Sequence, residues 1–114
     1  MHELSIALSM IEQVEEETAK HGGGAVETIY LRVGVLSGVD MHALRFAFEL
    51  AREGTALAAT RLEVEPIPLL VYCPQCAATH APDLENITCP RCVTPEQKIL
   101  MGKELEIRAF EIAA

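Results

Sequence analysis

The sequence has no tryptophan, and aromatic residues make up only 4% of its 114 residues. Aromatic side chains on which nucleic-acid bases stack are therefore scarce. Basic residues are also few, since 9 lysines and arginines stand against 17 acidic residues and the net charge is −8. Nucleic-acid binding rests largely on neutralising phosphates, so we expect no nucleic-acid partner. The acidity suits a protein that handles cations or meets a basic partner surface.

Long apolar stretches are also missing. No run approaches the roughly 20 apolar residues that a membrane span needs, and the N-terminus lacks the basic lead and apolar core of a signal peptide. We therefore expect no membrane partner and a cytoplasmic location, where thiols stay reduced. The length suits about one ordinary domain, so a second module needs something other than a hydrophobic core to hold it together.

Cysteine is the scarce residue that carries the most information. The chain has four, and they form two Cys-x-x-Cys pairs, Cys73-Pro-Gln-Cys76 and Cys89-Pro-Arg-Cys92, with twelve residues between the pairs. Four thiolates at this spacing suit one tetrahedral zinc ion, and a site closed by four thiolates is structural and not catalytic. We predict one structural Zn(II) per chain bound by Cys73, Cys76, Cys89 and Cys92, and no enzyme activity. Two disulfides or four unconnected thiols are the alternative.

Two further readings of the cysteine region stay open. A thiol redox enzyme places Cys-x-x-Cys where a strand meets a helix, whereas prolines surround the first pair here, at positions 66, 68, 74 and 82. His80 lies within the loop between the pairs. We expect it to be exposed, and the alternative is that it competes for the zinc or tunes it through a hydrogen bond.

Periodicity predicts five regular elements around the cysteine region. Spacings of three and four predict helices, and alternation predicts strands. The expected order is a helix from the first residues to Lys20, a strand over Glu27–Val35, a helix capped by Asp40 and ended by Gly54, and strands over Arg61–Pro66 and Lys103–Ile112. In the first helix the expected buried stripe is Leu4, Ala7, Leu8, Ile11 and Val14, and in the last strand Leu105 and Ile107 are expected inward.

These elements predict an α+β fold. We expect a small, mainly antiparallel sheet with two helices on one face, plus an inserted zinc-ribbon module. The expected domains are residues 1–69 with 97–114, and the inserted zinc-binding module over 70–96. A short sheet with an edge strand also permits pairing of two copies as a homodimer.

The first three residues form a second candidate site. The amine of Met1, the backbone nitrogen of His2 and its imidazole chelate one metal ion through fused small rings, and Glu3 supplies a fourth donor. Square-planar nitrogen coordination of this kind suits Ni(II) or Cu(II). The alternative is a histidine at position two by chance, on a disordered terminus.

The combination of motifs resembles a known family. The start Met1-His2-Glu3-Leu4-Ser5, the segment Val33-Gly34-Val35-Leu36-Ser37-Gly38-Val39 and the two cysteine pairs are similar to those of the hydrogenase nickel-insertion accessory proteins, HypA and its paralogue HybF. The resemblance covers essentially the whole chain, and we see no departure from the family pattern at these positions.

The resemblance implies a nickel metallochaperone of [NiFe]-hydrogenase maturation. It implies that His2 is required for binding a transferable Ni(II), that Glu3 supports it, and that the four cysteines bind zinc. The implied partners are a nickel-handling GTPase of the same pathway and the hydrogenase large subunit, and some members also serve urease. The alternative function is a zinc-ribbon protein-interaction adaptor that transfers no nickel.

Overall fold

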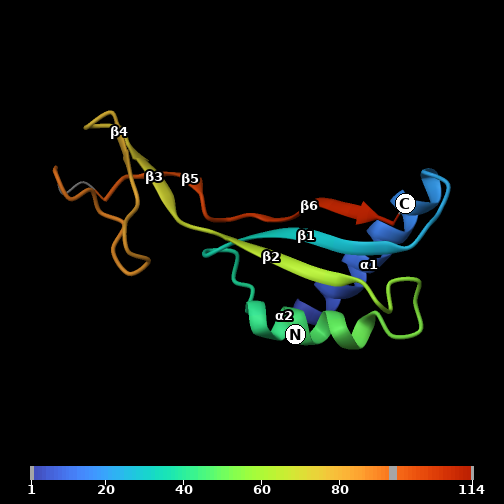
Figure 1. Ribbon diagram of the computed structural model, residues 1–114. Coiled ribbons are helices and arrows are strands. Elements are labelled where there is room, and N and C mark those ends of the chain that lie inside the picture. The colour runs from blue at the N-terminus through green and yellow to red at the C-terminus, as the bar shows by residue number, and fades with distance from the viewer. Residues whose placement is uncertain (1, 93–94, 114) are drawn as a thin grey trace. The chain divides into compact units, whose positions relative to one another are not determined.

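The computed structural model describes residues 2–92 and 95–113. In these residues the chain forms two helices and six strands, in the order that Figure 1 shows. Their bounds are α1 His2–Lys20, β1 Val26–Gly34, α2 Met41–Ala51, β2 Arg61–Ile67, β3 Leu70–Cys73, β4 Ala78–His80, β5 Lys98–Met101 and β6 Leu105–Ile112. The five elements expected from periodicity are therefore present, with ends that differ by a few residues.

The strands form two three-stranded sheets with the orders β2-β1-β6 and β4-β3-β5. In the second sheet β3 pairs antiparallel with both neighbours. In the first sheet β6 is antiparallel to β1, and β2 is parallel to β1 (Figure 1). Helix α2 connects β1 to β2. The α+β class and the mainly antiparallel pairing are confirmed.

Helix α1 buries a stripe that differs from the expected one. Ala7, Ile11 and Val14 are buried as expected, and Met10 joins them. Leu4 and Leu8, expected to be buried, are 49% and 52% exposed. The apolar arc of the helix is wider than the strip its neighbours cover, so the packing partners, and not the helix itself, set which part is buried.

Helix α2 has the predicted cap and packs against α1. One carboxylate oxygen of Asp40 accepts the N–H groups of His42 and Ala43 at 2.9 and 3.1 Å, which satisfies donors that have no partner within the helix. Leu44 and Phe48 are buried, as are Ile29 and Leu31 of β1. The two helices and the alternating side chains of β1 thus form one core on one face of the sheet.

Strand β6 differs from its expected burial. Leu105 is 41% exposed, whereas Ile107 and Phe110 are half-buried. An edge strand has a neighbour on one side only, so alternation along its sequence does not by itself give full burial.

The chain divides into two compact units. The first contains residues 2–32, 39–65 and 106–113, and the second contains 33–38 and 66–105 apart from 93–94. In the second unit the segment 33–38 is held by backbone hydrogen bonds, among them Gly34 N–H to Glu104 O at 2.7 Å and Val35 N–H to Ile67 O at 3.0 Å. The expected division into a nickel-binding domain over 1–69 with 97–114 and an inserted zinc-binding module over 70–96 stays a prediction. No described helix has the length and hydropathy to cross a bilayer.

Candidate metal centre

The second unit brings the four cysteines together. Cys73 ends β3, and the turn after it is closed by pairing of Cys73 with Ala78. Ala77 in that turn has a φ of 51°, the left-handed conformation that tight turns use. Cys76 lies in the same turn, and Cys89 and Cys92 lie in the loop between β4 and β5. A short hairpin and a returning loop thus supply one cysteine pair each.

The sulfur positions fit one metal ion. All four Sγ atoms lie within 4.8 Å of one another, with 3.5 Å between Cys73 and Cys92 and 3.7 Å between Cys76 and Cys89. A disulfide needs about 2.05 Å, and none of the four cysteines is in a disulfide. A tetrahedron of thiolates with metal–sulfur bonds of about 2.3 Å has edges of about 3.8 Å. The cluster therefore fits a thiolate-bound metal such as zinc, and the disulfide alternative does not describe it.

The surroundings of the sulfurs also shift the pKa values of two thiols. The backbone N–H of Cys76 hydrogen-bonds the Cys73 sulfur and lowers the pKa of Cys73 to about 6. The neighbouring Cys92 sulfur raises the pKa of Cys76 to about 12. Four thiolates this close repel one another, so ionising one holds the others protonated. A divalent ion bound by the four cysteines would remove that repulsion and stabilise all four thiolates.

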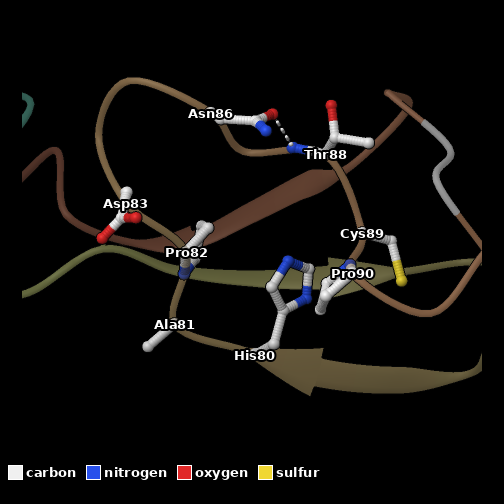
Figure 2. A pocket seen from close by; sticks show the side chains of 8 residues that line it. All are labelled: His80, Ala81, Pro82, Asp83, Asn86, Thr88, Cys89 and Pro90. Carbon is white, nitrogen blue, oxygen red and sulfur yellow. Dashed lines mark hydrogen bonds between the residues drawn. The ribbon is translucent and has the colours of Figure 1, made fainter.

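His80 stands beside this cluster in a hollow of about 430 Å³. Figure 2 shows its ring between Pro82 and Pro90, with Asp83 and Asn86 on the surrounding loop. The residue is half-buried, and its Nε2 is buried without a hydrogen-bond partner. The expectation that His80 is exposed is therefore wrong, because the loop between the cysteine pairs folds over it.

The N-terminal candidate site is described in part. Met1 and the side chain of His2 lie outside the described residues, while α1 begins at His2. The carboxylate of Glu3 accepts the backbone N–H of Asp40 at 3.2 Å, and this hydrogen bond lowers the pKa of Glu3 below its ordinary value. Sequence reasoning missed this contact, because the two residues are 37 positions apart and no local pattern links them.

Comparison with known proteins decides the family. The family described as "Hydrogenase/urease nickel incorporation, metallochaperone, hypA" matches residues 1–112. The chain belongs to the HypA family. Hydrogenase maturation factor HypA of Roseiflexus sp. (strain RS-1) is 46% identical over 112 residues, covering 97% of this chain and 91% of that protein. The same factor from Chloroflexus aurantiacus (strain ATCC 29366 / DSM 635 / J-10-fl) is 41% identical, covering 97% and 98%.

Solved structures of HypA proteins share the fold. A solution structure of a HypA protein aligns with a TM-score of 0.74 at 25% identity, covering 99% of this chain and 97% of that one. The solution structure of the nickel metallochaperone HypA from Helicobacter pylori aligns with a TM-score of 0.67 at 24% identity, covering 98% and 97%. HypA is a family of maturation factors and metallochaperones and not of catalysts.

Proposed function

We propose that this protein binds Ni(II) at its N-terminus through Met1, His2 and Glu3 and delivers it during [NiFe]-hydrogenase maturation. Membership in a nickel-incorporation family supports the cargo. The observation that supports the location of the nickel site is that α1 begins at His2. The chelating residues therefore lie at the start of a helix.

A helix start leaves its first amides available. The first four N–H groups of a helix have no acceptor within the helix, and those of His2 and Glu3 are among them. In the middle of a helix, a backbone nitrogen that loses its proton to bind a metal ion also loses its helical hydrogen bond. At the start of α1 the amide has no such hydrogen bond to lose, so nickel binding and an intact α1 are compatible.

Charge sets a condition on this site. The N-terminal end of a helix carries partial positive charge and disfavours a cation by about 0.3–1 kcal/mol. Each amide that loses its proton to bind Ni(II) adds one negative charge, and the Glu3 carboxylate adds another nearby. We therefore propose deprotonated amide nitrogens as ligands, since they remove the net positive charge of the bound ion.

The four cysteines have a separate role in this proposal. Cys73, Cys76, Cys89 and Cys92 hold one structural Zn(II) per chain, which the closed cluster of sulfurs supports. Zinc joins β3 to the loop before β5 and so supplies folding free energy that a small module lacks.

Release of nickel proceeds by ligand exchange. A terminal site is open to acceptor groups, which replace the amine, the amides and the imidazole one at a time. The proposed partners are the nickel-handling GTPase of the pathway and the hydrogenase large subunit. Because amine, amide and imidazole ligands must lose protons to bind, affinity for Ni(II) falls as the pH is lowered.

Substitution of His2 tests the assignment. We expect His2→Ala to abolish stoichiometric Ni(II) binding in a calorimetric titration, while zinc content and the unfolding transition stay unchanged. His42→Ala is the matched control, because His42 is an exposed histidine near the start of the other helix, and it keeps wild-type affinity. Unchanged affinity in His2→Ala would sink the proposal and favour a zinc-ribbon adaptor.

A further inference from the structure

A hollow of about 330 Å³ lies at the C-terminal end of α1. Its walls include Glu15 and Ala19 of α1, Gly23 of the turn that follows, and Ala56 and Leu57 of the loop after α2. All of these residues belong to the first compact unit. Ligand pockets have volumes of about 300–1,000 Å³, so this α1-end hollow has room for one small group, such as a single side chain.

The glycine turn after α1 keeps one wall of the α1-end hollow free of side chains. The Gly23 N–H donates to the Thr18 carbonyl at 2.8 Å and so ends the helix. Gly23 has a φ of 82°, a conformation that glycine adopts without strain. A Cβ atom built on Gly23 would meet nothing within 4 Å. The wall is therefore backbone, with open space beside it.

Glu15 is the one charged residue that lines the α1-end hollow, and it is half-buried. Its Oε2 accepts the Ala56 N–H at 3.4 Å, which is longer than the usual range of about 2.7–3.2 Å. A carboxylate has about four acceptor positions, so this one long contact leaves most of them available.

No basic residue in the described part of the chain forms an ion pair with Glu15. Lys20, which is near it in the sequence, pairs with Glu17 at 3.3 Å. The C-terminal end of a helix also carries partial negative charge. The α1-end hollow therefore combines apolar walls with an uncompensated negative charge, and this combination favours a cation on an apolar stem.

We propose that the α1-end hollow binds an arginine side chain of a partner protein. A guanidinium presents two parallel N–H groups to a carboxylate, here that of Glu15. Its aliphatic stem packs against Ala19, Ala56 and Leu57. A lysine ammonium is a compact point charge without this fork, so it binds less tightly. The net charge of −8 attracts a basic partner surface to this chain.

The α1-end hollow is remote from the proposed nickel site. Glu15 and His2 lie on one helix, and a rise of 1.5 Å per residue separates them by about 20 Å. An arginine bound beside Glu15 thus leaves the N-terminus uncovered. The proposal does not rest on nickel binding, and His2→Ala leaves the arginine site unchanged.

A capped peptide tests the charge requirement. The probe is Ac-Ala-Arg-Ala-NH2, and the control peptide replaces its arginine by citrulline, which has nearly the same shape and no charge. In NMR titrations of the full, zinc-loaded chain, we expect the arginine peptide to shift the amide resonances of Ala19, Gly23 and Ala56 in a saturable way. Glu15→Gln should weaken this binding by about tenfold or more, because a charge-assisted pair is lost. Glu16→Gln is the matched control and keeps wild-type affinity, because Glu16 is exposed and lies outside the hollow.

A second pair of variants tests the shape of the α1-end hollow. Ala56→Leu adds a side chain to its wall from an exposed position, and we expect it to block the arginine peptide. Ala59→Leu makes the same change at an exposed position of the same loop that does not line the hollow, and it leaves binding unchanged. Unaltered spectra of the free variants show that each is folded.

Four results would overturn the proposal. They are no saturable shift with the arginine peptide, equal shifts with the citrulline peptide, equal affinity for a lysine peptide, and equal losses in Glu15→Gln and Glu16→Gln.

Discussion

Glu3 connects the proposed nickel site to another part of its unit. Its carboxylate accepts the Asp40 N–H, and Asp40 caps α2 through its own side chain. One hydrogen bond therefore joins the first turn of α1 to the first turn of α2. The Glu3 carboxylate therefore has two roles in this account, because its Oε2 accepts the Asp40 N–H and the same group is a proposed donor to nickel.

The Glu3 contact has a defined pH dependence. The Asp40 N–H stabilises the ionised carboxylate, so the pKa of Glu3 in the folded chain lies below its ordinary value of 4.5. The stability that the contact contributes is complete above that ordinary value and is lost as the pH falls through the lowered pKa. We expect the Asp40 amide resonance in NMR spectra to titrate with a midpoint below 4.5.

Glu3→Gln provides the comparison for this titration. The amide side chain does not ionise in this range, so the pH-dependent shift of the Asp40 resonance disappears in the variant. A wild-type midpoint at or above the ordinary value of 4.5, or the same titration in the variant, would show that another group causes the shift.

At the scale of single elements, the cap of α2 is the feature that the sequence predicts best. An aspartate directly before an apolar helical pattern is a local signal, and its carboxylate accepts two N–H groups as expected. We expect Asp40→Ala to lower the free energy of unfolding by about 1 kcal/mol. Asp40→Asn keeps an acceptor and retains most of that stability. Denaturant unfolding of the zinc-loaded chain measures both, and equal losses in the two variants would refute the capping role.

The contact between Gly34 and Gly102 belongs to the second unit and has no local signal. A Cβ atom on Gly34 would overlap the carbonyl group of Gly102 and lie 2.6 Å from the Lys103 nitrogen. These atoms are backbone and have little freedom to move aside. We expect Gly34→Ala to cost about 3 kcal/mol or more, at the upper end of overpacking effects.

Gly38→Ala is the matched control for Gly34→Ala. Gly38 lies in the same segment with a φ of 79°, and a Cβ there meets nothing within 4 Å. Its substitution carries only the cost of the left-handed conformation, about 1–2 kcal/mol. Similar losses in the two variants, measured by denaturant unfolding, would contradict the close approach at Gly34.

Features that depend on neighbouring residues in the sequence could be predicted, whereas features that depend on contacts between distant residues could not. The five elements, the Asp40 cap and the cysteine cluster follow from periodicity, end signals and spacing. The strands β3, β4 and β5 were not predicted, because they are three or four residues long and carry no clear alternation. The exposure of Leu4 and Leu105, and the Glu3–Asp40 contact, depend on which elements pack together, and single-sequence patterns do not contain that information.

At the scale of the whole molecule, the zinc cluster and the helical unit have separate sources of stability. Both helices lie in the first unit, while all four cysteines lie in the second. We expect Cys73→Ala to lose zinc and to unfold the second unit, because Cys73 is buried and ends the central strand of its sheet. The helical circular dichroism signal persists, and amide exchange of Val71 and Tyr72 becomes fast.

Removal of zinc from the wild type by a chelator is the parallel experiment. It should reproduce the fast exchange of Val71 and Tyr72 without any change of sequence, and restored zinc should reverse it. A Cys73→Ala chain that keeps one zinc and its thermal transition would show that the ion is not structural.

The most direct test of the central claim is a Ni(II) titration of the chain with its native terminus beside a copy extended by a few residues before Met1. The extension removes the free amine at Met1 and leaves every side chain in place. The account predicts tight one-to-one binding by the native chain, with the d–d absorbance of square-planar nitrogen coordination, and loss of that binding on extension. Equal binding by both chains would contradict it, because nickel would then be held by side chains and not by the terminal amine.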